Sequence, residues 1–160
     1  MIRGARSERR SLAYEPHDLS RRLEAKEALK RPAVNFDDGQ IRSVAEGFAT
    51  YVTRSGLPMH ACAIMPDHVH LVIGRAEMKV EQAVIQLKGA ATVRLIEEGL
   101  HPFGAERDST GRPPKCFARG EWKVFLDPDD VEKAILYVEN NPVREGREKQ
   151  EWSFVVPWEG

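Results

Sequence analysis

Apolar residues recur at helical spacing in the stretch that begins at residue 41. They are Ile41, Val44, Ala45, Phe48, Tyr51 and Val52. Positions separated by three and four residues share one face of a helix, so this pattern predicts a helix that packs against a core. The following Ser55-Gly56-Leu57-Pro58 is typical of a helix end.

Two short apolar runs come next, at residues 59–65 and 68–74, and Pro66-Asp67 lies between them. Runs of this length suit strands, and a proline followed by an aspartate is a turn signal. The sequence therefore predicts a β-hairpin. A second amphipathic helix should follow, ended by Gly99, with its apolar face formed by Val80, Ala83, Val84, Leu87, Ala91 and Leu95.

The third part of the pattern begins after a long loop at 99–120, which is rich in glycine, proline and charge. Residues 121–126 carry aromatic and β-branched side chains and predict a strand. Asp127 and Pro128 then predict a helix start, as a capping residue and a proline at the first helical position. The helix should pack through Val131, Ala134, Ile135 and Val138, and end at Asn141-Pro142. Tyr137 and Asn141 are four residues apart and should lie on one flank of this helix, beside the packing stripe.

Residues 1–40 show the weakest pattern, with a short strand expected at 11–14 and helical composition at 19–30. We divide the chain into a charged N-terminal extension at 1–40, a core at 41–146 and an aromatic tail at 147–160 that packs on the core. The order of elements predicts an α+β protein, with a ferredoxin-like antiparallel sheet and helices mainly on one face.

Composition adds few constraints to this fold. The 160 residues are 41% hydrophobic and 31% charged with a formal net charge of −1, and no apolar run is long enough to span a membrane or to form a secretory signal. We expect a cytoplasmic protein with no membrane partner, and Cys62 and Cys116 as free thiols. Lysines and arginines cluster at 3–31 and 107–123, either as solvated faces or as a local surface for nucleic-acid phosphates.

His68 and His70 are the first candidates for chemistry. Side chains alternate along a strand, so both imidazoles should project to one side and could bind a single divalent metal ion. Two protein ligands would leave coordination positions open for substrate or water. Alternatively, one histidine lies on the surface and the other is a hydrogen-bonded core residue.

Three motifs, in order, resemble those of a known family. They are Met65-Pro66-Asp67-His68-Val69-His70, Gln86-Leu87-Lys88-Gly89 and Tyr137-Val138-Glu139-Asn140-Asn141-Pro142. Together they resemble the single-tyrosine HUH transposases, which include insertion-sequence transposases and REP-associated tyrosine transposases. The resemblance covers residues 41–146, while the expected first strand is poorly marked.

The resemblance implies a function and a set of site residues. His68 and His70 would bind Mg²⁺ or Mn²⁺ with Asn141 as third ligand, and Tyr137 would attack single-stranded DNA to give a 5′-phosphotyrosine link. The DNA would carry hairpin-forming repeat ends, and a homodimer is left open. The candidate contacts to the DNA backbone are Lys88, Arg119 and Lys123.

Two other functions fit parts of the same pattern. A non-catalytic or domesticated single-stranded nucleic-acid-binding protein of the same fold would bind without cleaving. A metal-dependent hydrolase would need further ligands beside the His-x-His pair, and His17, His60 and His101 lack a spacing that supplies them. Loss of a covalent protein–DNA adduct in Tyr137→Phe would separate these functions.

Overall fold

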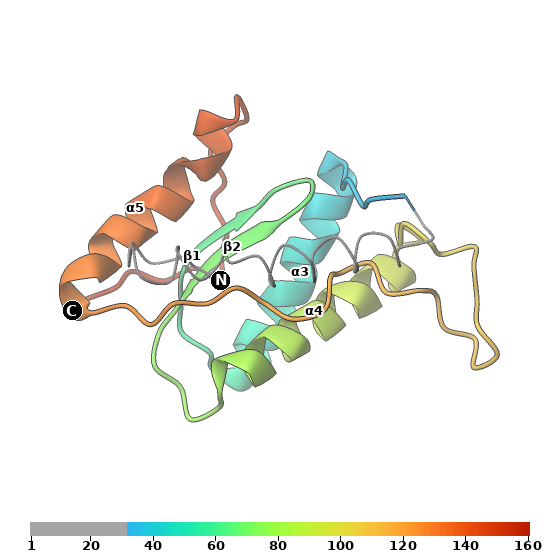
Figure 1. Cartoon of the computed structure of the whole chain (residues 1–160), viewed down its shortest axis with the longest axis horizontal. Coiled ribbons are helices and arrows are strands. Elements are labelled where there is room, and N and C mark those ends of the chain that lie inside the picture. The colour runs from blue at the N-terminus through green and yellow to red at the C-terminus, as the bar shows by residue number, and fades with distance from the viewer. Residues whose placement is uncertain (1–31) are drawn as a thin grey trace, which may run out of the picture.

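The computed structural model describes residues 32–160. The elements, shown in Figure 1, are α3 (Asp38–Ser55), β1 (Met59–Ile64), β2 (Val69–Ile73), α4 (Val80–Glu97) and α5 (Pro128–Arg144). Three predicted helices and the predicted hairpin are thereby confirmed, and with them the α+β class. The strand expected at 11–14 and the helix expected at 19–30 lie outside the described residues.

The hairpin is an antiparallel pair in which Ile64 lies opposite Val69 and Ala63 opposite His70. The amide of Met65 donates to the carbonyl oxygen of His68 at 2.8 Å and closes the turn. The ferredoxin-like arrangement stays a prediction, because the sheet within residues 32–160 contains these two strands.

Helices cover both faces of the hairpin, which lies between α5 and the α3–α4 pair in Figure 1. Cys62, Ile64 and Leu71 belong to the core that α3 and α4 share. The intervening residues of the strands face the other way and pack against α5, a second and smaller core made of Ala61, Ala63, Val72, Ala134 and Val138. The prediction placed helices mainly on one face; α3 and α4 share a face, and α5 lies on the opposite one.

Helices α3 and α4 approach each other closely at Gly47. A Cβ atom added there would lie 2.6 Å from Cα of Ala91 and 2.7 Å from the carbonyl oxygen of Ala90. A side chain at this position would therefore hold the two backbones apart. The start of α3 is fixed by a capping box, in which Asp37 and Gln40 each accept the other's backbone amide at 2.8 and 2.9 Å.

The prediction of a strand at residues 121–126 is wrong. These residues form no strand in the described structure and belong to the long connection between α4 and α5. Strand propensity reflects packing on a sheet surface more than an intrinsic backbone preference, and here the segment runs alongside α4, where Lys123 forms an ion pair with Glu81.

The predicted end of α5 at Asn141-Pro142 is also wrong, because the helix continues to Arg144 with Pro142 inside it. The amides of Glu145 and Arg147 donate to the Pro142 carbonyl oxygen at 3.1 and 2.8 Å. These bonds satisfy the last turn, which offsets the hydrogen bond that the proline nitrogen cannot donate. Asp127 is the N-cap and Pro128 the first helical residue as predicted, although the Asp127 side chain makes no capping hydrogen bond.

The C-terminal tail lies along the outer edge of β1. Phe154 is buried in the larger core, edge-on to Phe48 and stacked on Trp152. The Val156 amide donates to the Met59 carbonyl oxygen at 2.8 Å. The tail therefore covers backbone groups that a third strand would otherwise pair.

No helix within residues 32–160 is long and apolar enough to cross a membrane. Cys62 and Cys116 are free thiols, as predicted, and both are buried. Burial raises the pKa of the Cys62 thiol to about 12, so it stays protonated and unreactive at neutral pH.

Candidate functional site

His68 lies one residue before β2 and is oriented by its neighbour. Its Nδ1 donates to Oδ1 of Asp67 at 2.6 Å. This hydrogen bond fixes the ring, and in the neutral tautomer it leaves the lone pair on Nε2 for another partner. Metal-binding histidines usually donate a hydrogen bond to a carboxylate from the ring nitrogen that does not bind the metal.

His70 lies within β2 and projects toward α5. Its register partner Ala63 packs against that helix, which places the His70 side chain on the same face. The rings of His68 and His70 are edge-on with centroids 4.7 Å apart. The alternation of a strand thus brings the two imidazoles to one side, as the sequence predicted.

Tyr137 brings α5 to the same place. Its ring centroid lies 6.0 Å from that of His70, and the two rings are nearly perpendicular. The tyrosine is 45% exposed, so its hydroxyl group can meet a macromolecular substrate. Two segments separated by 67 positions in the sequence therefore meet at one surface.

Arg144 lies over the ring of Tyr137. Its guanidinium carbon lies 4.2 Å from the ring centroid, two helical turns beyond Tyr137. A guanidinium at this distance attracts the ring electrostatically and limits the orientations of the side chain. Its positive charge lies within a few ångströms of the phenol.

Asn141 follows Tyr137 by one turn but faces inward. The sequence placed it on the flank of the helix beside the packing stripe, whereas the residue is 5% exposed and follows the buried Val138. Its side-chain Oδ1 is buried without a hydrogen-bond partner. A buried carbonyl oxygen with no donor is costly, and coordination of a cation would satisfy it.

These residues fit a divalent metal by their donor atoms. Among residues 32–160 no group of three or more His, Cys, Asp and Glu side chains could hold a metal ion. The candidate set is of another kind, with two imidazoles and an amide oxygen, His68, His70 and Asn141. Such a set leaves coordination positions open, and the orphaned Asn141 oxygen is the observation that supports its inclusion.

The three predicted DNA contacts have different surroundings. Lys88 Nζ donates to the carbonyl oxygens of Ala118 and Gly120 at 2.8 and 2.5 Å, so it holds the long connection against α4. Burial lowers the pKa of its ammonium group. Lys123 is paired with Glu81, and Arg119 is exposed.

Sequence reasoning missed Asp67 and Arg144 as parts of the site. A signal existed for each: Asp67 directly precedes the first histidine, and Arg144 is seven residues after Tyr137, which puts both on one side of a helix. A hollow of about 620 Å³ lies elsewhere, in the connection between α4 and α5. None of the candidate site residues lines it.

Comparisons with protein-family models, with curated proteins and with solved structures each gave no match for this chain. The residues whose geometry bears on function are therefore His68, His70, Tyr137, Asn141 and Arg144.

Proposed function

We propose that this protein is a transposase-like enzyme that cleaves and rejoins single-stranded DNA through a covalent phosphotyrosine. The observation that carries the proposal is the meeting of two elements at one surface. The hairpin supplies the histidine pair, and α5 supplies an exposed tyrosine whose ring centroid lies 6.0 Å from that of His70. The motif resemblance to the single-tyrosine HUH transposases supports the same chemistry.

The reaction would be a transesterification at phosphorus. The Tyr137 phenol oxygen forms a bond to the phosphorus atom as the bond from phosphorus to the 3′ oxygen breaks. The phenol loses its proton and the departing 3′ oxygen gains one, which leaves a 3′-hydroxyl and a 5′-phosphate joined to the protein. Attack by a 3′-hydroxyl on this link reverses the step, so strands can be rejoined without an external energy source.

His68, His70 and Asn141 would hold Mg²⁺ or Mn²⁺. When bound, such an ion offsets negative charge that develops on a phosphoryl oxygen in the transition state. Asp67 would keep the His68 ring in the tautomer that presents Nε2, through the 2.6 Å hydrogen bond to Nδ1.

Arg144 would assist the nucleophile. An unperturbed phenol has a pKa of about 10 and is a poor nucleophile at neutral pH. The guanidinium lies 4.2 Å from the ring centroid, where it limits the orientations that the phenol can adopt before attack. Its planar donors can also bind a phosphate oxygen of the approaching strand.

The proposal is tested by incubating the protein with hairpin-forming single-stranded DNA and Mn²⁺, and by resolving adducts under denaturing conditions. We expect an adduct with the wild-type protein, none with Tyr137→Phe and a strongly reduced amount with His68→Ala. Tyr51→Phe is the matched control, because it removes a tyrosine hydroxyl that donates to Met78 Sδ at 3.0 Å in the core. This variant should form the adduct.

Two other outcomes identify the alternatives. DNA binding with no adduct from the wild-type protein would indicate a non-catalytic binder. Nicking that survives Tyr137→Phe would indicate a hydrolase that activates water, and either result would overturn the proposal.

A further inference from the structure

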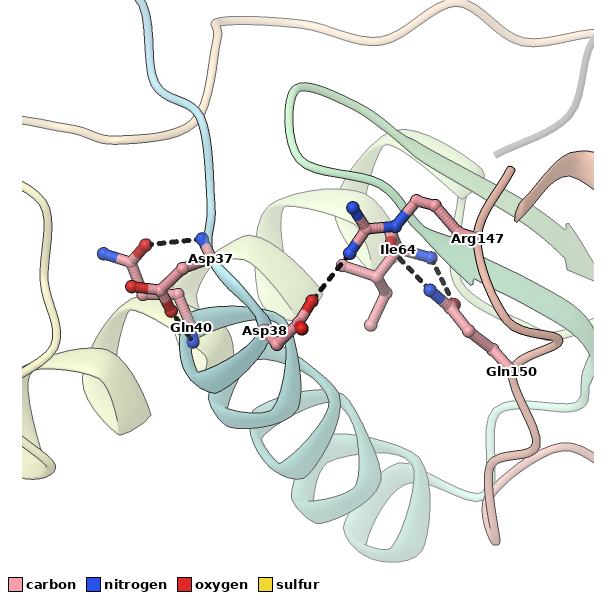
Figure 2. A network of polar contacts seen from close by, with 6 residues as sticks. All are labelled: Asp37, Asp38, Gln40, Ile64, Arg147 and Gln150. Atoms are coloured by element: carbon pink, nitrogen blue, oxygen red, sulfur yellow. Dashed lines mark hydrogen bonds and ion pairs between the residues drawn. The ribbon is translucent and has the colours of Figure 1, made fainter. Parts of the chain in front are cut away.

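The chain that leaves α5 is fastened to the hairpin a few residues later. Gln150 accepts from the Ile64 amide at 2.8 Å through Oε1 and donates to the Ile64 carbonyl oxygen at 2.7 Å through Nε2 (Figure 2). One side chain therefore satisfies both backbone groups of a fully buried residue of β1. The amide of Gln150 acts there as a one-residue substitute for a neighbouring strand.

Ile64 occupies a sensitive position in the hairpin. It lies opposite Val69, the residue between His68 and His70. The next residue, Met65, bonds back to the His68 carbonyl oxygen. A contact that holds Ile64 in place therefore also holds the part of the hairpin that carries the histidines.

The connection from α5 to Gln150 is short and internally bonded. Arg147 donates through its amide to the Pro142 carbonyl oxygen at 2.8 Å, directly after Asn141. Its guanidinium donates to Asp38 Oδ1 at 2.7 Å, at the start of α3, as Figure 2 also shows. The ion pair is exposed and contributes little, so the bonds of Gln150 are the main fastening.

We infer that Gln150 is a positioning residue that sets the tyrosine of α5 at its working distance from the histidine pair of the hairpin. The inference rests on the proposed function of that site. Helix α5 packs on the hairpin through Ala134 and Val138, in the smaller of the two cores. Fewer side chains therefore resist sliding of this helix along the hairpin than hold α3 and α4. Gln150 resists it by joining the C-terminal end of α5 to β1.

Gln150→Ala and Gln150→Glu test this role. In Gln150→Ala the rate of adduct formation should fall between about ten- and a hundred-fold, the range expected for a reacting group displaced by about 1 Å. The dissociation constant for DNA, measured without metal, should stay at the wild-type value. Gln82→Ala, which removes an exposed glutamine of α4, should match the wild-type protein in both measurements.

Gln150→Glu provides a signature that general destabilisation does not. An ionised carboxylate has two acceptors, so one oxygen repels the Ile64 carbonyl oxygen. A protonated carboxyl group has one donor and one acceptor, as the amide has. The rate relative to wild type should therefore rise as the pH is lowered from about 8 to about 5, toward the carboxyl pKa of about 4.3 or above. For Gln150→Ala the same ratio should stay constant.

A distance measurement is independent of activity. Spin labels at Asn140→Cys on α5 and Thr53→Cys on α3, both exposed positions, should give a narrow distribution with Gln150 and a broader or shifted one with Gln150→Ala. The buried native thiols Cys62 and Cys116 should stay unlabelled.

An unchanged distribution together with an unchanged rate would overturn the inference, as would a Gln150→Glu rate ratio that does not depend on pH. If the wild-type protein forms no adduct, the proposed function fails, and the distance distributions alone still decide whether Gln150 fixes α5.

Discussion

Asn141 is the candidate metal ligand whose own surroundings favour coordination of a cation. Its Oδ1 is buried with no donor, which costs the folded protein roughly 1–3 kcal/mol. A metal ion would remove this cost by accepting the oxygen as a ligand, so the residue should stabilise the loaded protein more than the empty one.

Asn141→Leu tests this idea, since leucine has the same branching and number of side-chain heavy atoms and no polar atom. Without metal, the free energy of unfolding should be unchanged or higher by up to about 1–3 kcal/mol. The increase in melting temperature that Mn²⁺ gives the wild-type protein should be lost. A metal-free variant much less stable than wild type would mean that the Asn141 side chain already has a partner.

Arg144→Gln tests the charge beside the nucleophile. Loss of a cation–π contact of about 0.5–2 kcal/mol corresponds to adduct formation slower by about 2- to 30-fold. The matched control is Arg54→Gln, because Arg54 also lies in the last turn of a helix, with its guanidinium 5.7 Å from the Tyr51 ring. Equal rates in the two variants would remove Arg144 from the site.

The sequence could indicate which residues are candidates for the site, but it could not indicate which of them lie next to one another. Strand alternation is a local rule, so the common orientation of His68 and His70 could be anticipated. The approach of Tyr137 to His70 depends on which face of the hairpin α5 covers, and no local rule sets that. Asn141 was placed on the flank because periodicity alone does not show that a polar residue is buried.

At the scale of elements, the α3–α4 contact depends on Gly47. Gly47→Ala would force a Cβ atom within 2.6 Å of Ala91 Cα, and overpacking of this kind costs about 1–3 kcal/mol. Gly89→Ala is the control, since a Cβ atom there meets nothing within 4 Å on α4 and should add about 0.5–1 kcal/mol of helix stability. Urea unfolding measures both, and a neutral Gly47→Ala would contradict the close crossing.

The long connection after α4 begins with a buried histidine, His101, which is 8% exposed. Its Nδ1 accepts from the Phe103 amide at 3.0 Å, which requires a neutral ring. Burial, with the charge of Arg107 adding to it, lowers the pKa of His101 below its ordinary value of 6.5.

The His101 side chain therefore binds a proton more readily in the unfolded chain than in the folded protein. The free energy of unfolding should fall as the pH drops below about 6.5. His101→Asn keeps an acceptor for Phe103 without a titrating group. It should lose part of the pH dependence in urea unfolding between about pH 7.5 and 5. An unchanged slope would show that His101 is not responsible.

The elements themselves were largely predictable, and the exceptions have physical causes. Periodicity located α3, α4, α5 and the hairpin because each has an apolar face. Residues 121–126 have the composition of a strand, but composition does not supply a neighbouring strand. Pro142 ends no helix because bonds to its own carbonyl oxygen complete the last turn.

At the scale of the whole molecule, a single chain contributes all the candidate groups. The hairpin lies between two layers of helices, and the layer formed by α5 brings Tyr137 to the strand that carries His70. The tail then lies along the outer edge of β1, where Gln150 forms hydrogen bonds with both backbone groups of Ile64. The fold thus joins the strand and the helix that carry the candidate site residues through contacts within one chain.

The most direct test is to identify the residue that becomes joined to DNA. The adduct formed with hairpin DNA and Mn²⁺ would be digested with protease and nuclease, and the modified peptide sequenced by mass spectrometry. We predict a single modified residue, Tyr137, linked to a 5′-phosphate, with a free 3′-hydroxyl on the released strand. A modification at another residue, or cleaved DNA with a free 5′-phosphate and no protein link, would contradict the account.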